Sequence, residues 1–170
     1  VLSPLLNFSA AVALVQTLNE QHPLNAQVKW PNDILISERK LAGILSEMEA
    51  EGDLVTYVNI GIGINVNNDP TKKEANAISL KKVMSRTVSR QKLLSGFLNR
   101  FEEKAKPEAI TGIVSEWKSY AATLRRRVRV VTHNDVYEGI AVDVDDSGAL
   151  MIKDNKGEIK KIVCGDCFQT

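Results

Sequence analysis

Apolar residues recur with two different periods along the chain, and the change of period predicts two kinds of local structure. Between residues 9 and 20 they recur at helical spacing, which predicts an amphipathic helix. Three short strands are predicted next, separated by a Pro-Asn-Asp turn and a polar hairpin turn. The strands cover residues 26–30, 34–36 and 41–49, and the turns cover residues 31–33 and 37–40.

The clearest strand signal lies in residues 56–66, where apolar residues alternate strictly with other residues. The apolar set is Val58, Ile60, Ile62, Ile64 and Val66, and the residues between them are Tyr57, Asn59, Gly61, Gly63 and Asn65. This alternation predicts one face in the core and a second face that is nearly bare. The polar residues 67–78 that follow predict a loop.

Two helices and then a series of strands are predicted for the rest of the chain. The helices cover residues 89–104 and a segment from Pro107 through Tyr120, and both should pack on the sheet. Strands are predicted at residues 128–130, 136–144, 150–152 and 159–163, with turns at 145–148 and 154–157. We therefore expect an α+β protein, with a sheet-and-helix domain at 1–122 and a small β-barrel at 123–170.

The composition excludes several classes of function. The 22 basic and 21 acidic residues leave a formal net charge of +1, so no global field would gather nucleic acid or an anionic membrane. The two cysteines are too few for the disulfide framework of a secreted domain. The apolar stretches are far shorter than the roughly 20 residues that cross a bilayer. We expect a cytoplasmic protein that engages neither a membrane nor nucleic acid.

Glycines on one face of a strand are the first candidate for a binding site. Gly61 and Gly63 weaken the strand in which they lie, which suggests that something approaches the backbone there. If this strand pairs with the one that holds Gly43, the three glycines form a floor for a flat ligand, with Asn65 at its edge. A β-bulge or a closely packed helix would also explain the glycines. A dinucleotide fingerprint does not, because Val66 and a polar loop follow.

Two lysines near this floor carry the charge that a phosphate or a carboxylate would need. Lys29 and Lys40 flank the predicted hairpin, although a hairpin lysine is more often simply solvated. Between them, residues 30–33 combine an aromatic ring, a proline, an amide and a carboxylate, which indicates either a turn or the wall of a site.

Two further motifs are given structural interpretations. Cys164 and Cys167 have the spacing of a redox pair or half a zinc site, but no second cysteine pair accompanies them, so we expect an inert pair in a strand turn and no metal site. The basic cluster at residues 125–129 lacks the interleaved aromatics of a nucleic-acid site, which favours a charged strand that links two domains.

Three sequence blocks together resemble the signature blocks of the biotin protein ligase family, in order and in spacing. They are residues 29–33 (Lys-Trp-Pro-Asn-Asp), 39–45 (Arg-Lys-Leu-Ala-Gly-Ile-Leu) and 61–67 (Gly-Ile-Gly-Ile-Asn-Val-Asn). The resemblance covers the whole chain. It implies a class II synthetase-like catalytic domain, a mixed sheet packed with helices, that lacks its N-terminal part, followed by an SH3-like barrel.

The resemblance also implies an activity and its participants. The family forms biotinyl-5'-AMP from biotin and ATP with Mg²⁺, and then transfers biotin to a lysine of a biotin carboxyl-carrier protein. The implied partners are the carrier of acetyl-CoA carboxylase or a similar carboxylase, and a second copy of the chain in a homodimer. No tightly bound cofactor is implied, and no side-chain nucleophile is needed because substrate groups attack in both steps.

Roles follow from the matching positions. Lys40 matches the lysine that contacts the reacting carboxylate and phosphate, where its charge would offset growing negative charge. Asn65 matches an adenine contact, and Asp33 matches an acidic residue that helps to position the metal or the acceptor lysine. The remaining implied binding residues wall the biotin and adenylate pocket or support its turn: Lys29, Trp30, Asn32, Gly43, Ile44, Leu45, Gly61 and Gly63.

Part of the family pattern is missing from this sequence. The Gly-Arg-Gly-Arg type loop, which folds over the adenylate, would lie upstream of residue 9, and the chain begins with Val1 rather than methionine, so we expect a further segment upstream. Two alternatives follow. The chain is a non-catalytic remnant that only binds a partner, or it is a related lipoate ligase, against which the first and third blocks argue.

Overall fold

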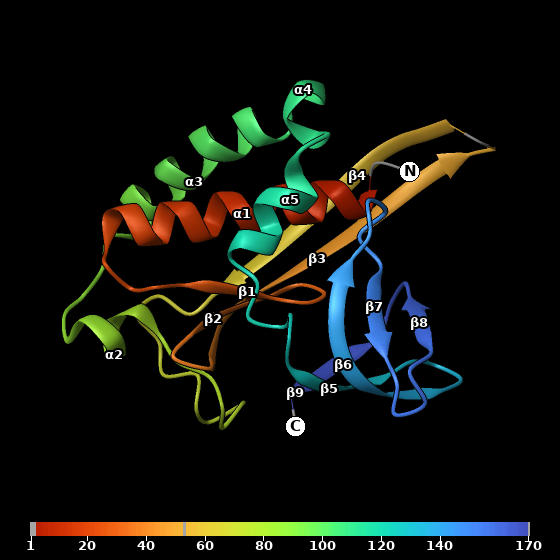
Figure 1. The fold of residues 1–170 in the computed structure, drawn as a ribbon. Coiled ribbons are helices and arrows are strands. Elements are labelled where there is room, and N and C mark those ends of the chain that lie inside the picture. Colours follow the sequence, from red (N-terminus) through yellow and green to blue (C-terminus); the bar gives the residue numbers. More distant parts are fainter. Residues whose placement is uncertain (1–2, 53, 170) are drawn as a thin grey trace.

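The first helix is buried on all sides rather than on one face. The computed structural model describes residues 3–52 and 54–169, so the first two residues of the chain lie outside the described part. Helix α1 (Ser3–Gln21) lies between a sheet and the two helices α3 (Arg90–Lys104) and α5 (Ile113–Ser119) (Figure 1). From Phe8 to Val15 every residue is at most 3% exposed. The predicted helix is present and begins earlier, at Ser3, but its predicted amphipathic character was wrong, because α1 has a protein layer on both sides.

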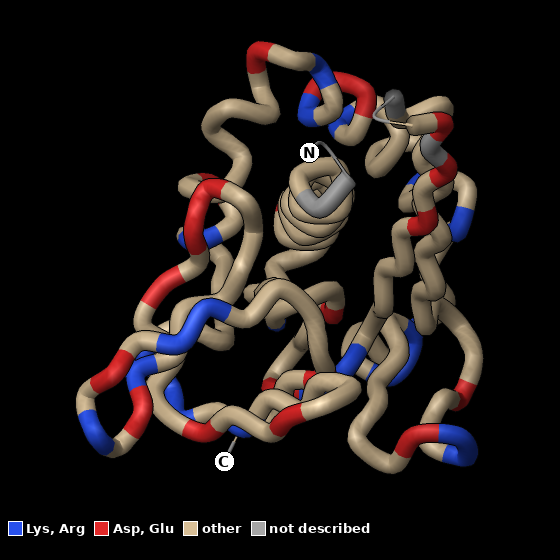
Figure 2. The backbone as a smooth tube through the Cα atoms, turned by 90° about the vertical axis from the view of Figure 1, so that its right-hand side faces the viewer, with Lys and Arg blue, Asp and Glu red and all other residues tan. Residues whose placement is uncertain are grey.

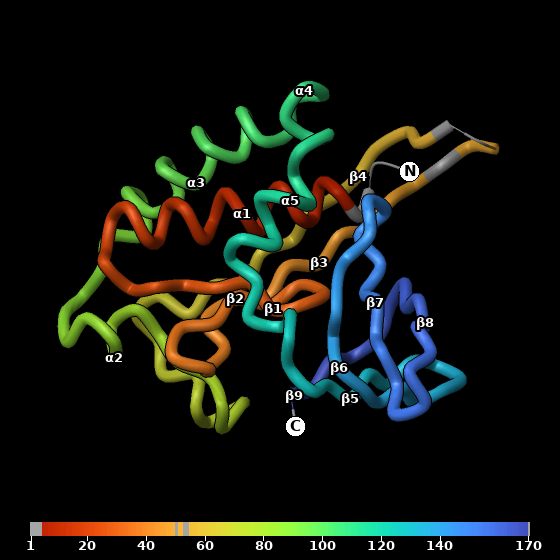
Figure 3. The backbone as a smooth tube through the Cα atoms, in the orientation of Figure 1, coloured from red at the N-terminus to blue at the C-terminus, as the bar shows by residue number. Residues whose placement is uncertain are grey.

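The sheet beneath α1 has four strands in the order β1-β2-β3-β4. Their bounds are Gln27–Lys29, Asp33–Ile36, Arg39–Glu51 and Leu54–Ile64. All three ladders are antiparallel, and the parallel pairing expected of a mixed sheet is limited to two isolated bridges, Val28–Ala121 and Lys40–Ala77. Strands β3 and β4 form a long hairpin that extends past the start of α1 (Figure 3).

The connection from β4 to α3 is a loop with one short helix that was not predicted, α2 (Leu80–Met84). Helix α3 matches its predicted span, with Ser89 as its N-cap accepting a hydrogen bond from the Lys92 backbone N–H. The single helix predicted after Pro107 is divided into α4 (Pro107–Ile110) and α5. Gly112 lies at the break, where a glycine weakens helix continuation.

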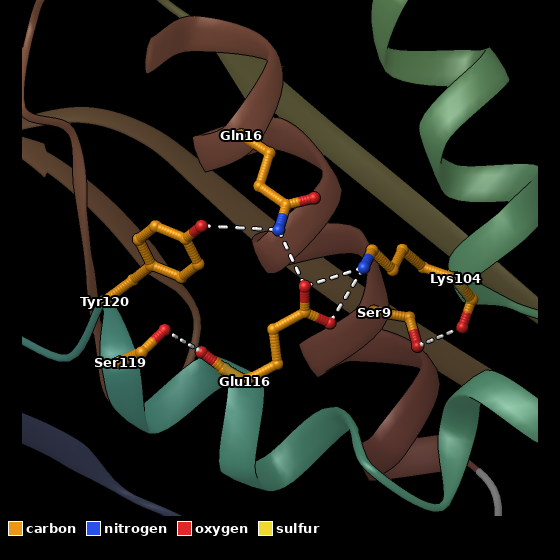
Figure 4. A network of polar contacts seen from close by, with 6 residues as sticks. All are labelled: Ser9, Gln16, Lys104, Glu116, Ser119 and Tyr120. Carbon is orange, nitrogen blue, oxygen red and sulfur yellow. Dashed lines mark hydrogen bonds and ion pairs between the residues drawn. The ribbon is translucent and has the colours of Figure 1, made fainter. Parts of the chain in front are cut away.

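A polar network holds the helical layer together, and Glu116 is its centre (Figure 4). The Glu116 carboxylate accepts hydrogen bonds from the Gln16 side chain at 2.7 Å and from Lys104 Nζ at 2.6 and 2.8 Å. Three helices, α1, α3 and α5, therefore meet at one half-buried carboxylate. In α1, Ser9 also donates to the Lys104 carbonyl oxygen at 2.9 Å.

The last part of the chain is a five-stranded antiparallel sheet in the order β8-β7-β6-β5-β9. In chain order the strands are β5 (Arg127–Val131), β6 (Val136–Val144), β7 (Leu150–Lys153), β8 (Ile159–Ile162) and β9 (Asp166–Gln169). Strand β9 was not predicted, and its first two residues were assigned to a turn. Within the described residues β8 and β9 do not pair, so the sheet is not a closed barrel. Gly165, at φ +144°, packs against the Val131 carbonyl oxygen and directs β9 onto β5.

The two sheets are joined by specific contacts. The Trp30 backbone N–H donates to Thr123 Oγ1 at 2.8 Å, and its indole N–H donates to the Gly148 carbonyl oxygen at 3.0 Å. Lys118 of α5 pairs with Asp143 of β6 at 2.7 Å. Charges of both signs are interspersed along the backbone in Figure 2, in line with the near-neutral total. Within the described residues, no helix has the length and apolar character that a membrane span requires.

Candidate active site

One cross-strand row brings together residues from four strands. In the register, Lys29 lies opposite Asp33, Asp33 opposite Gly43, and Gly43 opposite Gly63. Residues directly opposite one another in a sheet project from the same face, here the face away from α1. The row therefore places two charged side chains beside two positions that have no side chain.

A bulge in β3 turns Lys40 toward this row. Strict alternation would put Lys40 on the same face as Ala42, which is buried on the α1 side. The register shifts between Ile34 and Leu35, so that Leu41 is the extra residue on β3. Bulges of this kind re-aim side chains and are frequent next to active sites. Lys40 consequently faces the cleft.

Asp33 lies between two ammonium groups. Lys40 Nζ is 2.9 Å from Asp33 Oδ1, and Lys29 Nζ is 3.5 Å from Oδ2. Burial by itself would lower the pKa of Lys40, but the hydrogen bond and charge of Asp33, together with the charges of Glu74 and Asp166, raise it above the ordinary lysine value. Lys40 is therefore a fixed cation over the neutral pH range.

The glycine floor is open rather than packed. A Cβ added at Gly63 would meet no described atom within 4 Å, and one added at Gly61 would meet only the Leu45 carbonyl oxygen, at 3.8 Å. The β3–β4 register is also regular at both glycines, since its only shift lies at Glu49–Ala50. Neither a bulge nor a closely packed helix explains these glycines. The remaining explanation is a ligand that lies against the backbone.

At Gly43 the restriction comes from the charged pair itself. A Cβ there would lie 3.5 Å from Lys40 Cε and 3.6 Å from Asp33 Oδ1. An alanine would just fit, whereas a larger side chain would compete with the pair for space. Gly43 thus lets Lys40 lie flat across β3 to reach Asp33.

These features surround a cleft of about 660 Å³. Nine of the ten predicted binding residues, and Lys40, line it; Asn65 does not. The Asn65 side chain instead accepts a hydrogen bond from Asn68 at 2.9 Å, just past the end of β4. The cleft residues are Lys29, Trp30, Pro31, Asn32, Asp33, Lys40, Gly43, Ile44, Leu45, Gly61, Ile62, Gly63, Glu74, Asp166, Cys167 and Phe168.

Three of the predicted residues contribute differently from a direct ligand contact. Trp30 is 1% exposed and its indole N–H donates to the Gly148 carbonyl oxygen, so its ring lies beneath the cleft rather than in it. A cis peptide bond joins it to Pro31. Ile44 is 1% exposed and packs in the core on the α1 side. The Asn32 carbonyl oxygen accepts from the Ile44 backbone N–H at 2.9 Å, which fixes the turn against β3.

The sequence reasoning missed six cleft residues. Pro31 and Ile62 lie between predicted site residues, and the other four come from two segments far along the chain. Glu74 belongs to the loop before α2, and Asp166, Cys167 and Phe168 belong to β9. No alternation in the sequence indicated β9, because Cys167 and Phe168 are both apolar although only Cys167 is buried. With Asp33, the two added carboxylates give the cleft three acidic groups around its two lysines.

The cysteine pair is not a disulfide, and its members differ in exposure. Cys164 is exposed and Cys167 is buried, and both are free thiols. Burial raises the pKa of Cys167 to about 11, with Lys29 lowering and Asp33 raising it further. Among the described residues, no group of three His, Cys, Asp or Glu side chains is arranged to hold a metal ion.

Two family models match separate parts of the chain. Residues 3–65 match the Biotin/lipoate A/B protein ligase family, and residues 123–168 match the Biotin protein ligase C terminal domain. The first match contains β1 to β4 with the glycine floor and Lys40. The second contains β5 to β8 and, of β9, the three residues that line the cleft.

Individual proteins give the same assignment. The chain is 39% identical to the Bifunctional ligase/repressor BirA of Bacillus subtilis over 96% of its own length and 52% of that protein, so it spans about half of that relative. It is 30% identical to the Biotin--[acetyl-CoA-carboxylase] ligase of Paracoccus denitrificans, covering 89% of the chain and 68% of that protein. A structure of the Aquifex aeolicus biotin protein ligase, at 25% identity, superimposes with a TM-score of 0.81 over 99% of this chain and 75% of that one. The chain belongs to the biotin protein ligase family.

Proposed function

We propose that this chain carries out the ATP-dependent activation of biotin and its transfer to a lysine of a biotin carboxyl-carrier protein. The observation that carries the proposal is the unfilled glycine floor beside the Lys40–Asp33 pair. The nearly planar ureido ring of biotin fits a floor without side chains, and a fixed cation beside it suits a carboxylate that reacts at a phosphate. The named activity of the Paracoccus relative and an Aquifex structure in complex with biotin and ATP support the choice of substrates.

In the first step a biotin carboxylate oxygen would attack the α-phosphorus of ATP, and pyrophosphate would leave with its Mg²⁺. Negative charge grows on the equatorial phosphate oxygens, and the Lys40 ammonium would offset it. Its raised pKa keeps this charge in place. Holding the two reactants in line supplies a large share of the rate without a protein nucleophile.

In the second step the uncharged amine of the acceptor lysine would attack the acyl carbon of biotinyl-5'-AMP, and AMP would leave. Asp33, which already bridges Lys29 and Lys40, would position the incoming amine or the metal that accompanies ATP. Glu74 and Asp166 would add negative potential that draws the acceptor ammonium toward the cleft. Asn65, at the end of β4, would bond the adenine.

The proposal extends to the domains, the location and the partners. We divide the chain into a catalytic part at 1–122 and a C-terminal domain at 123–170, and we place the protein in the cytoplasm. The acceptor would be the carrier domain of acetyl-CoA carboxylase or a similar carboxylase. Strand β4 pairs only with β3 among the described strands, and its other edge is where a second copy would add to the sheet. Lipoate has no better support as the substrate.

The test is a transfer reaction followed by intact-mass measurement. The chain is mixed with biotin, Mg-ATP and an apo carboxyl-carrier domain, with matched reactions that contain lipoate or a carrier whose acceptor lysine is replaced by arginine. We expect the carrier to gain one biotin, and neither matched reaction to give a product. A carrier that stays unmodified while the chain still binds it would instead indicate a non-catalytic binding module.

A further inference from the structure

A two-pronged ion pair connects the C-terminal sheet with the turn that precedes Lys40. Arg126 Nη2 donates to Glu38 Oε1 at 2.7 Å, and Nη1 donates to Glu38 Oε2 at 2.9 Å. Arg126 directly precedes β5, whereas Glu38 lies in the hairpin turn between β2 and β3. The parallel donor pair of a guanidinium on a carboxylate fixes direction as well as distance.

Glu38 has a backbone conformation that its own residue type does not favour. Ser37 and Glu38 have φ angles of 50° and 63°, the left-handed pair of a tight hairpin turn. Asparagine and glycine suit such positions better than glutamate does. The choice of glutamate is therefore not explained by the turn, and its contact with Arg126 is what the carboxylate adds.

The turn is also held on its other side, by the loop that precedes α2. Asn76 Nδ2 donates to the Glu38 carbonyl oxygen at 3.3 Å, and the Lys40 backbone N–H donates to the Asn76 carbonyl oxygen at 3.0 Å. The Ile78 N–H donates to the Lys40 carbonyl oxygen at 2.8 Å. The turn that ends two residues before Lys40 is therefore held by Arg126 on one side and by Asn76 on the other.

Arg126 is itself anchored beside the strand that reaches the cleft. Its carbonyl oxygen accepts from the Ala141 N–H at 2.9 Å, and its Nη1 donates to the Gln169 side chain at 3.3 Å. Gln169 belongs to β9, whose first residue, Asp166, lines the cleft with Lys40. One guanidinium therefore contacts both the strand that brings Asp166 and the turn that brings Lys40.

We propose that Arg126 and Glu38 are positioning residues, which set the place of Lys40 in the cleft according to how the C-terminal sheet is docked. The effect on adenylation rests on the proposed function; the effect on the place of Lys40 does not. Exposed ion pairs contribute little to overall stability, and both side chains are about half exposed. Removing this ion pair should therefore change the position of Lys40 without unfolding the protein.

The experiment compares three variants with the unchanged chain. Glu38→Asn keeps a residue suited to the left-handed turn but cannot reach the guanidinium, Arg126→Gln removes the charge, and the third combines both. Glu138→Gln is the matched control, since Glu138 pairs with Arg129 at 3.4 Å within the C-terminal sheet. The pKa of Lys40 is measured in the ligand-free protein from its ¹³Cε NMR signal, assigned with Lys40→Arg, and biotinyl-adenylate formation gives kcat and KM.

We expect both single variants to lower the Lys40 pKa toward the ordinary lysine value, because a displaced Lys40 loses its contact with Asp33. We expect kcat to fall about 10-fold while the KM for biotin stays within about twofold, as for a misplaced catalytic group. The double variant should be no worse than either single one, because both remove the same contact. Glu138→Gln should change neither quantity.

Three outcomes overturn the inference: a Lys40 pKa and kcat that do not change, effects that add in the double variant, or losses that only follow a lower unfolding midpoint. Should the unchanged chain make no adenylate, the proposed function fails. The Lys40 titration then still decides on the positioning role by the same criterion.

Discussion

The two sheets contain the same kinds of residue in opposite surroundings. Gly63 of β4 has no described atom within 4 Å of an added Cβ, whereas a Cβ on Gly139 of β6 would lie 2.2 Å from the Lys153 carbonyl oxygen. Each sheet also has a lysine–aspartate pair, Lys40–Asp33 at 2.9 Å and Lys161–Asp145 at 2.6 Å. A strand glycine packed against protein is explained by the fold, and one that faces open space calls for a ligand.

The aspartates of the two pairs show the same contrast. Asp145 also accepts hydrogen bonds from the Ser147 and Ala149 backbone N–H groups at 2.9 and 3.1 Å, so its carboxylate closes a turn. Within the described part of the chain, the Asp33 carboxylate contacts only the side chains of Lys29 and Lys40, and Lys40 reaches it across Gly43. The first pair serves the turn in which it lies, and the second is available to a substrate.

The largest effect is expected from removing the Lys40 charge. Lys40→Met should reduce biotinyl-adenylate formation by about 100-fold or more, because the growing phosphate charge loses its counter-charge. Stability should change by less than about 1 kcal/mol, since the lysine is partly exposed. Pyrophosphate release measures the first quantity and urea unfolding the second. Lys161→Met is the counterpart in the other sheet, and an equal loss of activity there would remove the distinction between the pairs.

Next in size is the effect of filling the packed glycine. Gly139→Ala should destabilise the protein by about 2–3 kcal/mol, because the added methyl overlaps the Lys153 backbone and the Ile152 side chain. The free energy of unfolding in urea measures this. If the variant is as stable as the unchanged chain, β6 and β7 can separate more easily than the structure indicates.

The open glycine should respond in the opposite sense. Gly63→Ala should stabilise the chain by about 0.5–1 kcal/mol, since alanine loses less conformational freedom than glycine in a strand. It should weaken biotin binding by about 10-fold, a difference of about 1.4 kcal/mol, because the methyl occupies the floor. Calorimetric titration and urea unfolding give the two numbers. Weaker binding together with lower stability would show that Gly63 has a structural role after all.

The smallest effect concerns the buried thiol where the two sheets meet. Burial raises the Cys167 pKa to about 11, from an ordinary 9.0, so folding favours the neutral thiol. A thiol whose pKa is higher in the folded than in the unfolded state contributes its full share of stability below the unfolded pKa. This contribution to the free energy of unfolding is lost as pH rises through the folded pKa. Between pH 7 and pH 9 the loss is about 0.4 kcal/mol, and it should be absent in Cys167→Ala. Unfolding curves at both pH values measure the difference. A steeper loss in the variant would contradict the assignment.

The sequence predicted the repeating parts of the site and missed those that depend on distant contacts. Strict alternation in residues 56–66 placed Gly61 and Gly63 on one face, because period-two order is local. The bulge that turns Lys40 into the cleft depends on how β2 and β3 pair, and no residue in either strand indicates a bulge. Glu74 and Asp166 reach the cleft only through the packing of a loop and of β9.

Helix and strand assignments failed for similar reasons. The order of apolar residues in α1 predicted a helix. It did not predict the second protein layer, formed by α3 and α5, that covers the outer face of this helix. Strand β9 has only four residues, and its neighbours Cys164 and Gly165 resemble a turn. Trp30 was expected to support a turn, and its indole also binds Gly148, a contact across 118 residues that no local pattern encodes.

The positions of the two tryptophans allow their fluorescence to report on the unfolding of two different parts of the protein. Trp30 is buried where the two sheets meet, and Trp117 is buried within the helical layer, stacked on Phe8 with ring centroids 4.7 Å apart. Fluorescence from a chain that retains only Trp30 would therefore follow separation of the sheets, and fluorescence from one that retains only Trp117 would follow melting of the helices. Comparing the two signals during denaturation would tell whether the halves of the cleft come apart before the core does.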